Sequence, residues 1–199
     1  EATELQRQQL RGGDAAGHVG HLQLDRLVGG ERLAEQHALG GVVEHFLQAG
    51  LDPANPPRTW DEFIKIGRRL TEEKGRNGFV FAAGLGGKAY WWSNFVWQAG
   101  GEVLEPAERG YARSVVGTPE AAKALDFFKR LTTETWKDAK GKTHGPIAKV
   151  SSAWSDEVNQ GKVSMWFGYT NDLMLTMSEV PISVLGIAAM PAGPAGSVG

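Results

Sequence analysis

The chain has 199 residues, of which 41% are hydrophobic and 22% charged, a length that suits one ordinary domain or two small ones with a sizeable core. Its 21 lysines and arginines against 23 aspartates and glutamates give a formal net charge of -2, which excludes the strong basic field of a nucleic-acid binder. Because the chain has no cysteine, disulfide frameworks and thiolate metal sites are excluded, while the cellular compartment stays open.

Residues 1–45 differ in composition from the rest of the chain. They contain four of the five histidines, and the first aromatic residue is Phe46 and the first lysine Lys65. Such a segment offers little with which to pack a core. We interpret it as an atypical leader that is disordered or not read in the native frame. The chain starts at Glu1 without a signal-peptide pattern, so we expect its start to be truncated.

The first regular elements are predicted directly after this segment. Residues 42–49 form a strand-to-helix stretch that ends at Gly50. A helix is then predicted from Thr59, because Thr59 can cap it and Glu62 completes a capping box. Its apolar residues recur at helical spacing, and they are Trp60, Phe63, Ile64, Gly67 and Leu70.

Strands and helices alternate in the remaining sequence. An apolar run over 78–84 predicts a buried strand, and a glycine turn leads to an aromatic-rich helix over 90–99. Thr118 and Pro119 open the next helix in a favourable way. Its expected core face consists of Ala121, Ala124, Leu125, Phe128 and Leu131.

The last third of the chain continues this alternation. We expect a surface loop over 137–149, a short helix over 155–160, an alternating strand over 163–167 and a final strand over 182–190. Strands interleaved with helices indicate a layered α/β or α+β fold.

No motif in the sequence assembles a catalytic or metal site. The glycine turn over 84–88 lacks the spacing of a phosphate-binding loop. His18 and His21 have no partners that would complete a metal site. There is no nucleophile elbow, and the carboxylate pairs fall at helix starts or solvated faces. We therefore predict no catalytic residue, no metal and no cofactor.

Aromatic residues beside polar loop ends are the strongest functional signal. Protein sites for sugars stack aromatic rings on the apolar face of the sugar and hydrogen-bond its hydroxyls. The candidate ligand-binding residues are Trp91, Trp92, Trp166, Tyr169, Thr170 and Asn171. Core packing is the competing interpretation of these rings, and for Trp60, Phe95 and Trp97 it is the preferred one.

Six segments in a fixed order resemble the extracellular solute-binding proteins of ABC importers, in particular the sugar-binding group. The segments are QAGLDP at 48–53, PRTWDEF at 57–63, FVWQAGG at 95–101, TPEAAKAL at 118–125, GKVSM at 161–165 and GIAAMPAGPAG at 186–196. The chain departs from the family pattern at two places. Ser164 takes the place of a usual alanine, and residues 39–45 lack the expected tyrosine-rich strand.

The resemblance implies a periplasmic-binding-protein-like α/β fold of two lobes that close on a ligand. Residues 46–78 would end the N-terminal lobe, and residues 79–199 would supply the crossover strand and most of the C-terminal lobe. The cleft aromatics of the family map by position onto Trp91 or Trp92 and onto Tyr169 with Thr170, and less closely onto Trp166.

The function implied is capture of a sugar or oligosaccharide by a monomeric receptor that delivers it to ABC permease subunits. Its place would be the periplasm or the cell exterior, with membrane contact only through the permease or a missing lipid anchor. Two alternatives are a fragment of a carbohydrate-active enzyme whose catalytic residues lie outside this chain and a non-functional truncated product.

Overall fold

The structure is a computed structural model that describes residues 38–73, 75–83, 87–106, 112–168 and 182–196. All of these residues belong to one compact unit, Leu33–Gly199. The statements below concern this unit.

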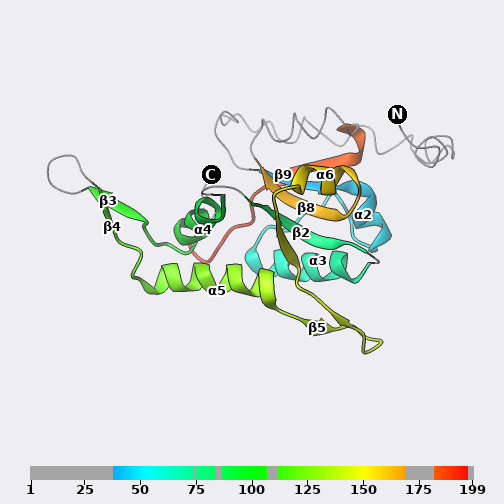
Figure 1. The fold of residues 1–199 in the computed structure, drawn as a ribbon, viewed down its shortest axis with the longest axis horizontal. Helices are drawn as coiled ribbons and strands as arrows, with labels where there is room; N and C mark the ends of the chain where they lie inside the picture. The colour runs from blue at the N-terminus through cyan, green and yellow to red at the C-terminus, as the bar shows by residue number, and fades with distance from the viewer. Residues whose placement is uncertain (1–37, 74, 84–86, 107–111, 169–181, 197–199) are drawn as a thin grey trace. The chain divides into compact units, whose positions relative to one another are not determined.

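A five-stranded mixed sheet forms the centre of the unit, with the strand order β7-β2-β8-β1-β9 (Figure 1). Strands β7, β2 and β8 are parallel to one another, whereas β1 runs antiparallel to both β8 and β9. The strands are β1 (Ala38–Val42), β2 (Asn77–Ala82), β7 (Ala148–Ser151), β8 (Val163–Gly168) and β9 (Leu185–Ala189).

The described helices connect these strands. They are α2 (Val43–Gln48), α3 (Trp60–Glu72), α4 (Gly87–Gln98), α5 (Pro119–Thr133) and α6 (Trp154–Asn159), with a short 3-10 helix at Ile182–Val184. Two small hairpins lie outside the sheet. One pairs β3 (Leu104–Pro106) with β4 (Ala112–Ser114), and the other pairs β5 (Trp136–Lys137) with β6 (Thr143–His144).

Local capping explains where the two long helices begin. The Glu62 backbone N–H donates to Thr59 Oγ1 at 3.2 Å, which confirms the helix predicted at Thr59. The Glu62 carboxylate accepts from the Arg58 backbone N–H, one residue before the position that a capping box predicts. At α5, the Ala121 backbone N–H donates to Thr118 Oγ1 at 3.3 Å.

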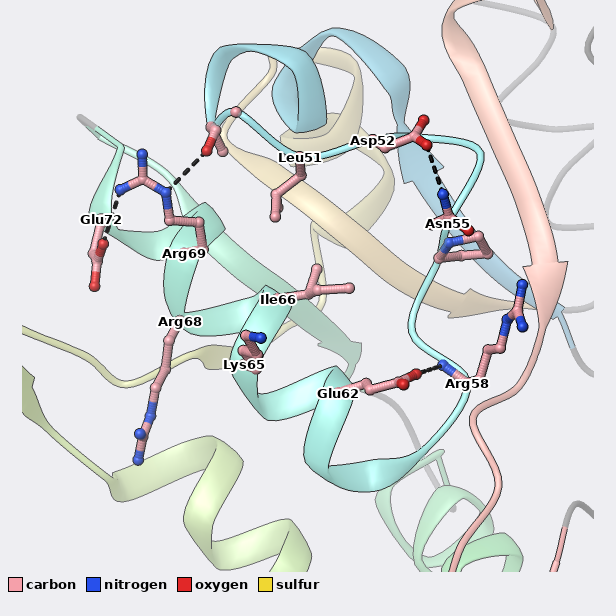
Figure 2. Close-up of a pocket in the computed structure, with 13 residues that line it drawn as sticks. Leu51, Asp52, Asn55, Arg58, Glu62, Lys65, Ile66, Arg68, Arg69 and Glu72 are labelled. Atoms are coloured by element: carbon pink, nitrogen blue, oxygen red, sulfur yellow. Dashed lines mark hydrogen bonds and ion pairs between the residues drawn. The ribbon is translucent and has the colours of Figure 1, made fainter.

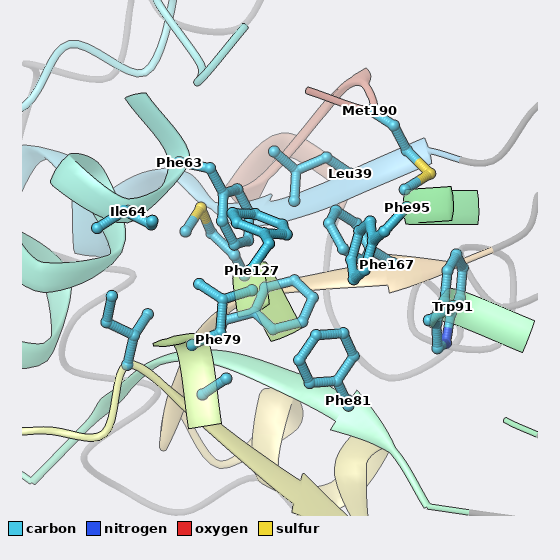
Figure 3. Packing of buried hydrophobic residues seen from close by; sticks show 14 of the residues in the cluster. Leu39, Phe63, Ile64, Phe79, Phe81, Trp91, Phe95, Phe127, Phe167 and Met190 are labelled. Carbon is cyan, nitrogen blue, oxygen red and sulfur yellow. The ribbon is translucent and has the colours of Figure 1, made fainter. Parts of the chain in front are cut away.

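The core lies on both faces of the sheet, because side chains alternate along its strands. On one face, Phe79 contacts Phe63 of α3 and Phe167 of β8, with ring centroids 5.1 and 4.6 Å apart (Figure 3). On the other face, Val80 and Trp166 belong to a second cluster with Val158 of α6. Helical cover on both faces explains why every residue of β8 is buried, where the sequence predicts alternation.

Two expectations about the elements are wrong. On α5, the expected core residue Leu125 is 56% exposed, and Phe127 is buried in its place, whereas the expected Phe128 does pack against the core, 4.7 Å from the ring of Phe81. The surface loop expected over 137–149 instead contains the end of β5, β6 and the start of β7, with Ile147 and Ala148 buried. Ala148 pairs with Phe79, and a pairing this distant in sequence leaves no local signal.

The fold boundaries also differ from those expected. Residues 38–45, assigned to the leader, form β1 and the start of α2, and β1 pairs with both β8 and β9. Helix α3 packs directly against β2 through Phe63 and Phe79. The predictions for residues 1–37 lie outside the described residues. The assignment of the unit to one lobe or another stays a prediction.

Buried His45 predicts a pH-dependent stability. Its Nδ1 lies 3.2 Å from Oγ of Ser164, and burial, with a smaller contribution from the charge of Arg76, lowers its pKa from 6.5 to about 4. The unfolded chain therefore takes up a proton between pH 6.5 and 4 while the folded chain does not. The contribution of His45 to the free energy of unfolding is fully present above pH 6.5. We expect the free energy of unfolding to fall by about 2 to 3 kcal/mol as the pH is lowered to 4.

Urea unfolding between pH 4 and 7.5 measures this loss, with His45→Gln as the matched variant. Glutamine cannot titrate but can still hydrogen-bond to Ser164. We expect a flatter pH profile for the variant. Parallel profiles for the two proteins would show that His45 does not cause the effect.

Candidate functional site

The ends of the strands define one edge of the sheet, which we call the carboxyl edge. Ala82 pairs with Ser151, and Gly168 pairs with Ala38, which in turn pairs with Ala189. Strands β2 and β8 are parallel, and Val80 lies opposite Trp166. Two residues further along each strand, Ala82 and Gly168 therefore lie at the same height in the sheet. The carboxyl ends of β7, β2, β8 and β9 thus share one row with the start of β1. Open α/β sheets bind ligands outside such an edge.

The chain leaves the carboxyl edge at the segments that carry the predicted site residues. The segment after β2 leads into α4, which holds Trp91 and Trp92. Tyr169, Thr170 and Asn171 follow β8 directly in the sequence, but their placement lies outside the described residues. The topology therefore brings the β2–α4 connection and the end of β8 to the same edge.

Two of the predicted ligand contacts are core side chains in this structure. Trp91 is only 4% exposed, and its ring lies 5.3 Å from the ring of Phe167 (Figure 3). Trp166 is 1% exposed and lies on the opposite face of the sheet from Phe167. Alternation along β8 explains this difference. Neither indole presents a face to solvent here, so a ligand role for either stays a prediction.

Trp92 has a different environment. Its side chain is half-buried and packs against the edge of the main core cluster. Its Nε1 is buried and has no hydrogen-bond acceptor among the described residues. Trp166 Nε1 is likewise buried without an acceptor among the described residues, so it is the partial exposure of Trp92 that separates the two indoles.

The polar end of β7 was not among the predicted site residues. Ser151 lies level with Ala82 on the carboxyl edge, and Ser152, one residue on, is exposed. Ser151 Oγ donates to Glu157 Oε1 at 3.1 Å, and Lys149 Nζ donates to the same oxygen at 2.7 Å. The two serines were overlooked because the strand before them was assigned to a surface loop.

The carboxyl edge carries no uncompensated charge among its described residues. The residues at and just beyond the strand ends are Ala82, Ala83, Ser151, Ser152, Gly168 and Ala189. The nearby Lys149 and Glu157 pair with each other.

A surface pocket of about 640 Å³ lies elsewhere, between α3 and the loop that precedes it (Figure 2). Its lining combines the apolar Leu51 and Ile66 with charged residues of both signs, including Glu62 and Lys65. None of the predicted site residues lines it. Within the described ranges, no His, Asp or Glu cluster could hold a metal, and no helix has the length and apolarity to cross a membrane.

Comparison with known proteins gives the family. The sequence family described as bacterial extracellular solute-binding protein matches residues 38–198. The chain belongs to this family. The match starts at the first residue of β1, so residues 38–45 are part of the family fold. No match is found among curated protein sequences.

Solved structures of solute-binding proteins share the fold. Maltose-bound MalE3 of T. maritima has 24% identity and a TM-score of 0.63, with 80% of this chain and 39% of that chain covered. An ABC transporter solute-binding protein of Thermotoga lettingae, bound with α-D-tagatose, has 25% identity and a TM-score of 0.62. The match covers 78% of this chain and 39% of that chain. UgpB of Mycobacterium tuberculosis, in complex with glycerophosphocholine, has 19% identity and a TM-score of 0.63. The match covers 79% of this chain and 37% of that chain.

These comparisons confirm the predicted fold class, an α/β fold like that of periplasmic binding proteins. This chain spans about two fifths of the length of the solute-binding proteins that it matches. The family and these neighbours are binding proteins rather than enzymes.

Proposed function

We propose that this chain is part of a receptor that captures a neutral sugar or oligosaccharide outside the cytoplasmic membrane and delivers it to an ABC permease. The family match over 38–198 carries this proposal. The uncharged carboxyl edge favours a sugar over a charged solute. Maltose and tagatose in the related structures belong to the same chemical class. Contact with the membrane would come through the permease or a lipid anchor.

We place the ligand at the carboxyl edge of the sheet. Trp92 would stack on the sugar, while Tyr169, Thr170 and Asn171 would contact it from the end of β8. Trp91 and Trp166 would support these contacts from the core, and Ser152 would add a hydroxyl from the end of β7.

The described unit would be one lobe of a two-lobe receptor. Its one five-stranded central sheet and its coverage of about two fifths of the related chains support this assignment. Ligand contacts from a second lobe would then drive closure, because a ligand shifts a conformational equilibrium only through differential affinity for the two states.

A thermal-shift screen tests the function, with titration calorimetry on each hit. The panel contains maltose, tagatose and mannitol as ligands without charged groups, and the zwitterion glycerophosphocholine as a ligand that carries charged groups. We expect at least one neutral saccharide to raise the melting temperature, since a ligand that binds only the folded state stabilises it. Stabilisation by charged solutes alone, or by none of the panel, would contradict the sugar assignment.

Trp92→Ala tests the site. We expect the affinity for the stabilising saccharide to fall by roughly 10- to 100-fold, because aromatic anchors commonly dominate binding. Trp97→Ala is the matched control on the same helix, since Trp97 is 36% exposed at the far end of α4. Calorimetry measures both variants after circular dichroism shows that they are folded. An equal loss in both variants would show that Trp92 is not a specific contact.

A further inference from the structure

The β5–β6 hairpin, residues 136–144, presents three lysines to solvent, and we call it the basic hairpin. Lys137, Lys140 and Lys142 are all exposed, and none of them has an ion-pair partner among the described residues. Figure 1 shows β5 and the following turn extending beyond the end of α5. The hairpin is therefore a projecting, positively charged element.

The turn of the basic hairpin is held in one conformation. Asp138 Oδ1 accepts the backbone N–H groups of Lys140 and Lys142, both at 2.9 Å. Its Oδ2 accepts a hydrogen bond from Nε2 of His144 at 2.9 Å, and these bonds hold the pKa of Asp138 below its usual value. Gly141 supplies the left-handed conformation that the turn needs, with φ of 79°. The only acid of the hairpin is thus engaged inside its own turn.

Trp136 anchors the basic hairpin to the body of the unit. Its Nε1 donates to Glu72 Oε1 of α3 at 3.0 Å, and the guanidinium of Arg68 lies 5.5 Å from its ring centroid. The ring of His144 stacks on the same indole at 6.1 Å. A two-stranded hairpin is at best marginally stable alone, so these contacts hold it in place.

The acids around the anchor do not neutralise the lysines. Glu72 pairs with Arg69 and Trp136, and Glu134 forms ion pairs with Arg68 and Arg130. Glu72 and Glu134 are therefore engaged by groups other than the side chains of the three lysines. The positive charge of the tip is left for an external partner.

We propose that the basic hairpin is a docking surface for an acidic patch on a protein partner. Charge complementarity raises association rates and fixes the docking register, and a rigid turn pays little ordering entropy. An anionic lipid surface fits less well. Three lysines, offset in part by Asp138, give only a weak electrostatic attraction to such a surface. Beyond its charged residues the turn offers only Ala139 and Gly141, so it has no large apolar side chain to insert.

A nuclear magnetic resonance titration tests the proposal. The probe is an eight-residue peptide rich in glutamate, added to the isotope-labelled chain at low salt. We expect shift changes concentrated in residues 136–144 and an affinity that falls as salt rises. The combined variant K137E, K140E and K142E should weaken binding at least tenfold, while circular dichroism stays unchanged.

The control variant reverses three exposed lysines outside the basic hairpin, K65E, K123E and K129E. It matches the first variant in net charge, so a specific docking surface predicts little loss of affinity. Equal losses in both variants, or shift changes spread over all exposed lysines, would overturn the proposal. Hairpin-dependent binding to vesicles of phosphatidylcholine and phosphatidylglycerol at 3:1, with no binding of the peptide, would also overturn it in favour of a membrane surface.

Discussion

Replacing Phe79 by alanine is expected to lower the free energy of unfolding by about 3 to 5 kcal/mol. Phe79 is fully buried at the centre of β2, and its ring lies within 5.1 Å of the rings of Phe63, Phe81 and Phe167. The substitution removes the ring and leaves a cavity between the sheet and α3. Urea unfolding, followed by circular dichroism, measures the loss.

Leu125→Ala provides the control for this experiment. The 56% exposure of Leu125 predicts a change within about 0.5 kcal/mol, although the residue pattern alone assigned it to the core. A loss as large as that of Phe79→Ala would show that the face of α5 is assigned wrongly. A small loss at Phe79 would show that the aromatic cluster is not the core of the unit.

Replacing Gly40 by alanine is expected to destabilise the fold by about 1 to 3 kcal/mol through overpacking. A Cβ at this position would lie 2.5 Å from Cε2 and Cζ2 of Trp166, so the indole of Trp166 has to move. Gly117→Ala is the matched control, because a Cβ there would meet nothing within 4 Å. Denaturant unfolding of both variants measures the difference.

A double-mutant cycle identifies Trp166 as the cause. Trp166→Leu removes the ring that a Cβ at Gly40 would strike, so Gly40→Ala should cost little in that background. We expect a coupling energy of at least about 1 kcal/mol. Additive losses would mean that the glycine is required for another reason.

The elements that were predicted correctly have signals contained in a few neighbouring residues. Thr59 with Glu62, and Thr118 with Ala121, define helix starts through contacts three residues apart, and Pro119 opens the second helix. β2 was recognised by its unbroken apolar run. The predictions that were wrong involve β7 and the buried face of α5, because pairing with β2 and packing against α4 depend on residues far away in sequence.

The candidate site was predictable only in part. The aromatic residues of α4 and the polar residues after β8 could be named from their neighbours in sequence. Which indoles are buried depends on the face of the sheet and the helices above it, and this separates Trp92 from Trp91 and Trp166. Ser151 and Ser152 became candidates only when β7 was placed beside β2.

By itself, the sequence determined the alternation of helices and strands, the helix starts and the resemblance to solute-binding proteins, since these depend on local periodicity and motif order. The tertiary structure alone decided the strand order, the common carboxyl edge and the inclusion of residues 38–42 in the sheet. It also decided that the acids around the basic hairpin are engaged and leave its lysines exposed. The physical reason is that strand pairing, burial and ion pairing join residues that are distant in sequence, and a linear pattern does not record which of them meet.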